Sequence, residues 1–216
     1  NTHYHSDEVE EFLSLQSFKN WVTTLYESKL SGTAGIIKNN SSFFLNKPLM
    51  VIHSDNWFDF EISNFLRIRE IAKSKNCLIT MLTFNCFNPE EVGVVELTSE
   101  GIVTNIFEKE STLKGSKANG AIYIFEREVV NWICKTENIS DISTHVLPKF
   151  LNKILTSHTE SYFRDIGSLP MLIAAQSDPA HILKWDNSLY WNKNVKFKKI
   201  NTQVELILGR SSKLSN

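Results

Sequence analysis

Two apolar runs with a helical stretch between them constrain the fold most strongly. "PLMVIHSD" at residues 48–55 and "CLITMLTF" at residues 77–84 are short, apolar runs, and the first ends abruptly in polar residues. Runs of this length and character are typical of strands in a buried sheet. Between them, residues 61–73 repeat apolar side chains at helical spacing. Alternation of strand and helix predicts a parallel sheet covered by helices.

The flanking segments extend this pattern. "WVTTLYE" at residues 21–27 is interpreted as an earlier strand, and a glycine-containing turn then leads into a helix that starts at "IIKNN". After the second buried strand the pattern alternates and predicts a hairpin over residues 92–110 that turns at Ser99-Glu100-Gly101. The remaining expected elements are a helix capped by Ser6, a strand at 118–126, helices near 127–134, 142–155 and 168–177, and a short strand within 161–167.

Composition excludes several classes of partner. The 216 residues are 42% apolar and 22% charged, with a net charge of -1, which is ordinary for a globular protein. A broad basic face for nucleic acid is therefore not expected. The apolar runs are too short to span a bilayer, so no membrane partner is expected either.

The cysteines indicate a reducing environment. Cys77, Cys86 and Cys134 are odd in number and show no C-x-x-C spacing, so neither a disulfide framework nor a zinc knuckle is expected. Small, buried apolar residues are the favoured interpretation. A cytoplasmic location follows from this pattern.

Two aspartates are the candidate metal ligands. Asp55 ends the run VIHSD, and ligands of open α/β sheets lie beyond the carboxyl ends of the strands. A carboxylate there can hold Mg²⁺, although a cap for the next segment is the simpler alternative. Asp165 precedes Ile166-Gly167, a pattern that is more often a simple turn. Two carboxylates on one metal would suit phosphoryl transfer, but their convergence is not visible in sequence.

Polar residues near two later strands are candidates for binding a sugar phosphate. Glu108-Lys109 closes one strand, where a lysine can neutralise a phosphate and a glutamate can accept from hydroxyls. The alternative is a solvated surface pair. Asn119-Gly120 begins the next strand, where an amide can hydrogen-bond a hydroxylated ligand, and the alternative is a β-bulge.

The order of these motifs resembles the sugar-1-phosphate nucleotidyltransferases. The resemblance runs from about residue 1 to about residue 177. It is clearest at GTAG (32–35), Gly93, Glu108-Lys109, Ala118-Asn119-Gly120 and Asp165-Ile166-Gly167. The family implies a Rossmann-like mixed sheet with flanking helices, and transfer of a nucleoside monophosphate from an NTP to a sugar 1-phosphate. The GTAG form of the turn is most similar to mannose- and heptose-1-phosphate guanylyltransferases, so GTP is favoured.

The resemblance also implies roles for single residues. Gly32, Thr33 and Ala34 would contact the nucleotide base, and Asp55 and Asp165 would bind Mg²⁺. Lys109 would hold the sugar phosphate, and so with the two aspartates it forms the predicted catalytic set. The predicted sugar-binding residues are Gly93, Glu108 and Asn119. Glu27 matches a family glutamate without an assigned role.

Three departures from the family pattern matter. The family opens with a strand and a glycine-rich loop whose N–H groups hold the NTP phosphates, whereas this sequence starts at NTHYH. It is therefore interpreted as an N-terminally truncated fragment that lacks the first strands and is inactive by itself. His53-Ser54-Asp55 replaces the usual N-G-D, and Glu110 replaces a proline after E-K.

The predicted organisation is a partial catalytic domain over residues 1–177 and an extension of unknown role over 178–216. The predicted ligands are an NTP, a sugar 1-phosphate and Mg²⁺, with assembly into a homo-oligomer left open. A non-catalytic homologue that binds nucleotide-sugars and regulates a partner is the competing interpretation. The departures are compatible with it, while the retained Asp55, Lys109 and Asp165 argue against it.

Overall fold

A computed structural model describes residues 1–15, 18–86, 92–108, 117–175, 195–199 and 205–209. The chain divides into two compact units, which we describe separately. The larger comprises Asn1 and Glu27–Ser177, and it contains all of the candidate site residues. The smaller comprises Thr2–Tyr26 and Asp178–Asn216.

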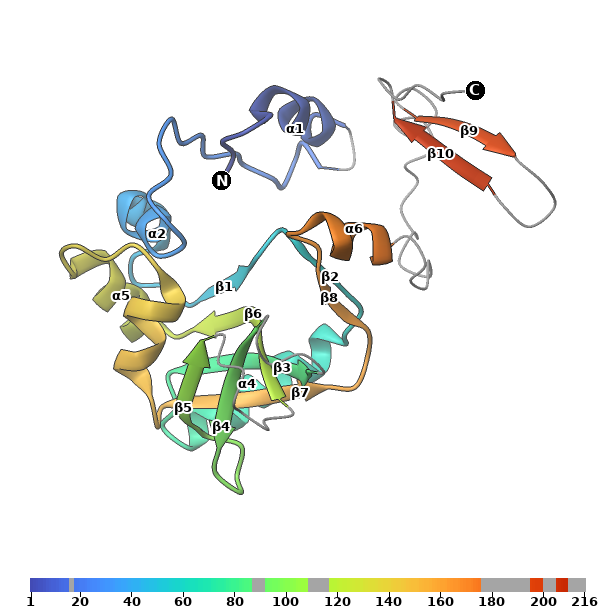
Figure 1. The fold of residues 1–216 in the computed structure, drawn as a ribbon. Coiled ribbons are helices and arrows are strands. Elements are labelled where there is room, and N and C mark those ends of the chain that lie inside the picture. Colours follow the sequence, from blue (N-terminus) through green and yellow to red (C-terminus); the bar gives the residue numbers. More distant parts are fainter. Residues whose placement is uncertain (16–17, 87–91, 109–116, 176–194, 200–204, 210–216) are drawn as a thin grey trace. The chain divides into compact units, whose positions relative to one another are not determined.

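A six-stranded mixed sheet forms the centre of the larger unit (Figure 1). Five strands follow the order β5-β4-β6-β3-β7, and β1 pairs with the second half of β6. The strands are β1 (Leu49–Ile52), β3 (Ile79–Asn85), β4 (Gly93–Leu97), β5 (Val103–Glu108), β6 (Lys117–Phe125) and β7 (Ile154–Thr159). Because β1 and β3 both run antiparallel to β6 and β7 runs parallel to β3, the carboxyl ends of β1, β3 and β7 point the same way.

Short helices complete the larger unit. They are α2 (Gly35–Asn39), α3 (Ser41–Phe44), α4 (Ile62–Ser74), α5 (Arg127–Lys135) and α6 (Leu169–Ala175), with a π-helical turn η1 (Ile142–Val146) and a 3₁₀ turn η2 (Leu147–Phe150). A separate two-stranded ladder joins β2 (Asn56–Phe58) to β8 (Phe163–Asp165).

The core lies on both faces of β6, because successive strand side chains point to opposite faces. Tyr123 and Phe125 are fully buried in the larger cluster, together with residues of β3, α5 and η1. Ile122 and Ile124 face a second cluster around Phe65 of α4. Two helical layers therefore bury the two faces of this strand.

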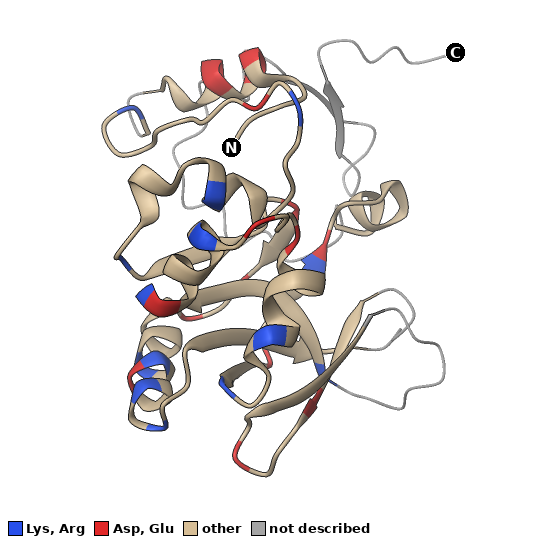
Figure 2. Ribbon diagram, turned by 90° about the vertical axis from the view of Figure 1, so that its left-hand side faces the viewer, with Lys and Arg blue, Asp and Glu red and all other residues tan. Residues whose placement is uncertain are grey.

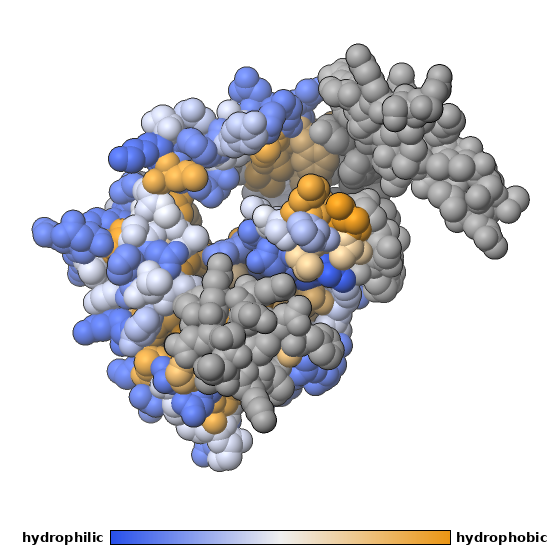
Figure 3. All heavy atoms as spheres, in the orientation of Figure 1, coloured by the Kyte–Doolittle hydropathy of each residue, from blue (hydrophilic) through white to orange (hydrophobic). Residues whose placement is uncertain are grey.

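One part of the surface stays apolar. Leu169, Leu172 and Ile173 of α6 have relative exposures of 69%, 43% and 62%. Figure 3 shows the exposed apolar atoms over this helix.

Most predicted elements of this unit are confirmed. The mixed α/β architecture is present, but the expectation of a parallel sheet is wrong: among the described strands of this sheet only β3 and β7 pair in parallel, because β6 lies between β1 and β3 and runs antiparallel to both. The helix over 61–73, the strands at 77–84 and 118–126, and the described part of the hairpin, Gly93–Glu108, are confirmed. The hairpin turns through Gly101, whose φ is +80°, a left-handed conformation that glycine adopts readily. Cys77 is buried and the other two cysteines are half-buried, in agreement with small apolar residues.

The helical stretch predicted near 142–155 is confirmed only in part. Residues 142–150 form the short helical turns η1 and η2, and strand β7 then begins at Ile154. Pro148 interrupts any regular helix because it has no N–H to donate. The following residues pair with β3 from Ile79↔Ile154 onward, and burial beside that strand overrides the local helical pattern.

The strand expected over 48–55 is correct in type but not in burial. None of the β1 residues is fully buried, and Ile52 is 45% exposed. The only described ladder of β1 is the one with β6, so its other edge is covered by no described strand. A buried central position needs ladders on both edges.

The smaller unit contains helix α1 (Ser6–Leu13) and the hairpin of β9 (Val195–Lys199) and β10 (Glu205–Gly209). The α1 helix is confirmed, but His5 with φ 51° occupies the capping position and Ser6 is the first helical residue. The strand expected at 21–27 is wrong, because only an isolated bridge joins Tyr26 to Thr2 and no ladder forms. Among the described residues, no helix has the length and apolarity needed to cross a bilayer.

Candidate active site

The GTAG turn is packed against a distant loop. Gly32 has φ +86°, and a Cβ atom there would meet the Ser140 carbonyl oxygen far inside the 3.0 Å that real Cβ atoms keep. The same carbonyl accepts hydrogen bonds from the backbone N–H groups of Ala34 (2.8 Å) and Gly35 (3.1 Å). Gly32 is therefore required by backbone conformation and by close approach together.

Thr33 fixes the other side of this contact. Its hydroxyl donates to the Asp141 carboxylate (3.1 Å) and accepts from the Ile142 N–H (2.8 Å). Asp141 also accepts from the backbone N–H and the hydroxyl of Thr144. Partial burial works to raise the pKa of Asp141, but the hydrogen bonds from Thr144 and Thr33 outweigh it and hold that pKa below its ordinary value. The carboxylate is thus a fixed anchor for the turn.

Glu27 closes the segment before the turn. Its carboxylate accepts from the Asn1 amide (2.7 Å), and from the backbone N–H and the hydroxyl of Ser31. Desolvation works to raise the pKa of Glu27, but the hydrogen bonds from Ser31 and Asn1 outweigh it and hold that pKa below its ordinary value. Glu27 therefore holds the backbone in place directly before the GTAG turn.

The two candidate metal ligands lie together. An ideal Cβ built on Gly167 would lie 2.9 Å from an Asp165 carboxylate oxygen and 3.3 Å from an Asp55 carboxylate oxygen. The Ile166 N–H donates to the Asp55 carbonyl oxygen (2.7 Å), which ties the two segments at this point. Two carboxylates that are 110 positions apart in the sequence therefore converge around one glycine.

This pair fits a magnesium ion. Both aspartates are exposed, and Mg²⁺ keeps several waters while it binds one or two carboxylates. The Gly167 N–H donates to one Asp165 oxygen (2.7 Å), which orients that carboxylate. Among the residues that the structure describes, no group of three or more His, Cys, Asp or Glu could hold a metal. An ion here would therefore rely on the two aspartates, water and substrate oxygens.

Asn119 shapes a β-bulge. The β3–β6 register shifts between Met81 and Thr83, and on β6 Ala121 takes the left-handed φ of 50°. The Asn119 side chain accepts from the Ala121 N–H (3.0 Å) and donates to the Tyr123 hydroxyl (2.8 Å). The side chain thus bridges the bulge, the alternative left open by the sequence.

The bulge supports the loop that carries Asp55. The Asn56 side-chain amide donates to the Gly120 carbonyl oxygen (3.0 Å), and the His53 N–H donates to the Ala121 carbonyl oxygen (3.4 Å). The backbone of the loop is therefore fixed on both sides of Asp55.

A pair of substitutions tests the bulge. Asn119→Ala should destabilise the fold by about 1–2 kcal/mol, because it removes a side-chain bond to a strained backbone. Ala121→Gly should stabilise it by up to about 1 kcal/mol, because glycine adopts positive φ without strain. Urea unfolding of both variants measures the two effects. Opposite signs are expected, and destabilisation by Ala121→Gly would contradict this explanation.

The other predicted sugar-binding residues are only partly described. Gly93 pairs with Glu108 in the β4–β5 ladder, and Val94 pairs with Ala118, so the backbones of all three predicted sugar-binding residues lie on neighbouring strands. The predicted phosphate ligand Lys109 lies outside the described residues, as does Glu110.

Comparison with known proteins now decides the family. The family model described as "Nucleotidyl transferase" matches residues 1–181. The chain belongs to the nucleotidyl transferase family. A relative from Sulfolobus acidocaldarius, provisionally named mannose-1-phosphate guanyltransferase, is 33% identical over 146 residues. That match covers 67% of this chain and 37% of the relative.

More distant nucleotidyl transferases also match. Mannose-1-phosphate guanyltransferase 2 of Candida glabrata is 26% identical, over 68% of this chain and 41% of its own length. A glucose-1-phosphate adenylyltransferase of Clostridium kluyveri is 24% identical, over 73% of this chain and 43% of its own length. The chain thus spans less than half of each of these relatives.

Solved structures confirm the fold. A provisionally named glucose-1-phosphate thymidylyltransferase of Bacillus anthracis superimposes with a TM-score of 0.66 at 21% identity, covering 80% of this chain and 71% of that one. HddC from Yersinia pseudotuberculosis, complexed with GMP-PN, has a TM-score of 0.61 at 19% identity, covering 80% and 74%. These likenesses support the nucleotidyl transferase architecture alone.

The sequence interpretation missed the partners of its own motifs. Ser140 and Asp141, which receive GTAG, are more than 100 residues away, and Asn56 was not singled out although it follows Asp55 directly. No local pattern pairs GTAG with residues 140–142. An Asn directly after a strand-end aspartate was the one signal that could have indicated a loop anchor.

Proposed function

We propose that the protein transfers a nucleoside monophosphate from a nucleoside triphosphate to a sugar 1-phosphate and releases pyrophosphate. The observation that carries this proposal is the convergence of Asp55 and Asp165 around Gly167, in a chain whose family is nucleotidyl transferase. A pair of exposed carboxylates with room for solvent suits a Mg²⁺-dependent reaction between two anionic substrates.

The chemistry needs positioning more than covalent assistance. An oxygen of the sugar phosphate attacks the α-phosphorus of the triphosphate in line, the bond to the bridging oxygen breaks, and pyrophosphate leaves. Bound Mg²⁺ would neutralise charge on the phosphate oxygens. Asp55 and Asp165 would hold it, and the bulge at Asn119 would keep the Asp55 loop in place. Lys109 is proposed to hold the sugar phosphate.

GTP and mannose 1-phosphate are the proposed substrates. Two of the relatives carry guanyltransferase names, and the GTAG turn resembles that branch. Other matches carry adenylyl and thymidylyl names. The base is therefore the point that an experiment must decide. Gly32, Thr33 and Ala34 are the proposed base contacts, with the turn held in shape by its bonds to the 140–142 loop.

A substrate panel tests the proposal. The complete gene product is incubated with Mg²⁺ and each pair of GTP, ATP or dTTP with mannose or glucose 1-phosphate, and pyrophosphate release is measured. Release is expected to be fastest with GTP and mannose 1-phosphate, and to stop without the sugar phosphate or with EDTA. Release with another triphosphate would move the proposal to that base. If no pair of substrates releases pyrophosphate but the protein still binds a nucleotide-sugar, the competing function would be favoured.

That competing function is regulatory binding of a nucleotide-sugar without turnover. One observation favours it: the Asn119 amide, a proposed sugar contact, is already committed to Ala121 and Tyr123. Against it, a binder has no need of two converging carboxylates. Catalysis therefore remains the preferred proposal.

A further inference from the structure

A hollow lies at the amino-terminal ends of strands β1, β3 and β7. Its volume is about 480 Å³, within the range of small-molecule sites. Pro48, Leu78 and Lys153 line it, and each directly precedes a strand of the sheet. Asp55 follows the carboxyl end of β1. The hollow is therefore separate from the candidate active site.

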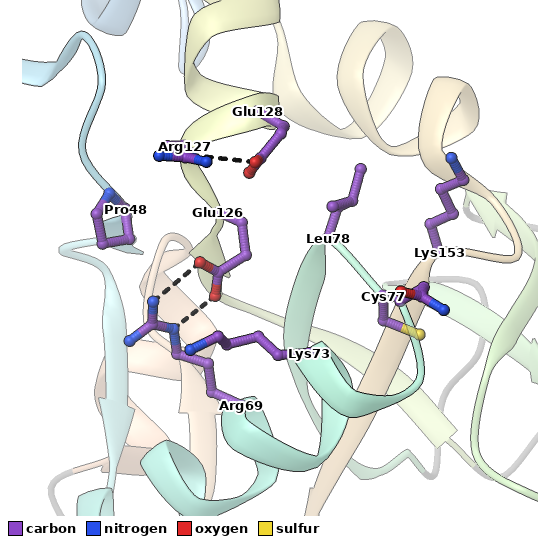
Figure 4. Close-up of a pocket in the computed structure, with 10 residues that line it drawn as sticks. Pro48, Arg69, Lys73, Cys77, Leu78, Glu126, Arg127, Glu128 and Lys153 are labelled. Carbon is purple, nitrogen blue, oxygen red and sulfur yellow. Dashed lines mark hydrogen bonds and ion pairs between the residues drawn. The ribbon is translucent and has the colours of Figure 1, made fainter.

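Six of the ten residues that line the hollow are charged. Four cations and two carboxylates face it: Arg69, Lys73, Arg127, Lys153, Glu126 and Glu128. They come from α4, the start of α5 and the turn before β7 (Figure 4). Burial raises the pKa of the Cys77 thiol, which also lines the hollow, so that thiol adds no negative charge near neutral pH. The described lining thus carries a positive excess.

One of these cations is held rigidly. Arg69 donates through Nε (2.6 Å) and Nη2 (2.9 Å) to the two carboxylate oxygens of Glu126, a bidentate pair with both side chains mostly buried. Figure 4 shows this pair at one side of the hollow. Its third nitrogen, Nη1, lies 3.9 Å from Glu70, beyond hydrogen-bond distance. A guanidinium fixed in this way presents its remaining donors without further loss of side-chain entropy.

Of the other three cations, Arg127 pairs with Glu128 through its Nε (3.1 Å), and the two lysines are less completely neutralised. Lys73 lies one turn after Arg69 on α4, a spacing at which like charges repel. Its described partner is Glu70, which is 62% exposed. Lys153 is exposed and makes no ion pair with any described residue. Figure 2 shows basic and acidic positions interleaved along α4. Lys73 lies beside Arg69, and Lys153 lies on the far side of the hollow (Figure 4).

We propose that this hollow binds a small phosphate-bearing anion, at a site distinct from the candidate active site. The fixed Arg69 guanidinium would supply directional donors, and Lys73 and Lys153 would supply mobile charge from two sides. The proposed ligand is a small molecule that carries one or two phosphate groups and fills the hollow. This proposal does not depend on the proposed nucleotidyl transfer.

Calorimetric titration with inorganic phosphate, at constant ionic strength and with EDTA present, tests it. EDTA removes divalent metal, so phosphate held by a metal at Asp55 and Asp165 does not contribute. Saturable binding is expected for the chain as it stands, and the double variant Lys73→Gln/Lys153→Gln should weaken it by about tenfold or more, because two charged contacts are lost. Phosphate should also raise the melting temperature of the parent chain and not that of the variant.

The matched control is Lys135→Gln/Lys149→Gln. These lysines are also exposed, and neither lines the hollow. Because net charge changes equally in both variants, the control should shift affinity by less than about twofold. Equal weakening in the two variants would mean that the binding is diffuse and would overturn the proposal, as would non-saturable binding by the parent chain. If the protein binds phosphate but is inactive in the substrate panel, the phosphate site in the hollow is supported and only the proposed nucleotidyl transfer is rejected.

Discussion

Gly32→Ala should cost about 3 kcal/mol or more of the free energy of unfolding. A methyl group at this position collides with the Ser140 carbonyl group, and the φ of +86° adds strain of about 1–2 kcal/mol for any residue with a Cβ. Relief of the collision requires the loop to move away, which breaks the hydrogen bonds from the Ala34 and Gly35 N–H groups, worth about 1 kcal/mol each.

The control is Gly101→Ala. Gly101 has nearly the same φ, +80°, but an added Cβ would come no closer than 3.2 Å, to the Thr156 hydroxyl oxygen. Gly101→Ala therefore introduces similar conformational strain with a much milder contact, and it should cost only about 1 kcal/mol. Urea unfolding at equilibrium compares the two. If Gly32→Ala costs no more than Gly101→Ala, the contact with Ser140 does not stabilise the turn.

Asp55→Asn should reduce pyrophosphate release by the complete gene product by at least about 10²–10³-fold, with the fold unchanged. The asparagine keeps the size of the side chain and removes the charge that would hold Mg²⁺. The hydrogen bonds that hold this loop, from the Ile166 N–H to the Asp55 carbonyl oxygen and from the Asn56 side-chain amide to the Gly120 carbonyl oxygen, do not use the Asp55 carboxylate. Stability should therefore stay within about 0.5 kcal/mol.

Two further variants sharpen this test. Gly167→Ala would place a methyl group between the carboxylates of Asp55 and Asp165 while leaving both charges in place. It should also suppress turnover if the two aspartates act on one ion. Asp59→Asn, an exposed aspartate on the same segment, is the control and should keep near-normal turnover. Normal turnover by Asp55→Asn would reject the metal assignment, and loss in Asp59→Asn as well would point to a general electrostatic effect.

Local patterns predicted the elements whose apolar spacing agrees with their tertiary surroundings. Helix α4 and strands β3 and β6 are examples, because the side chains that define their patterns are the ones that pack in the core. Residues 142–155 show the opposite case. Their helical spacing competes with Pro148 and with pairing beside β3, and the pairing prevails.

Sequence alone determined the family, the mixed α/β class and the two aspartates worth testing, because each depends on motifs and periodicities that are local in the chain. Tertiary structure decided what those motifs contact. It placed Asp55 beside Asp165, packed GTAG against Ser140, bonded Asn119 to a bulge and lined one hollow with charged residues from several segments. These are contacts between segments far apart in sequence, and local patterns do not encode which distant backbone will fill the space beside a glycine or an amide.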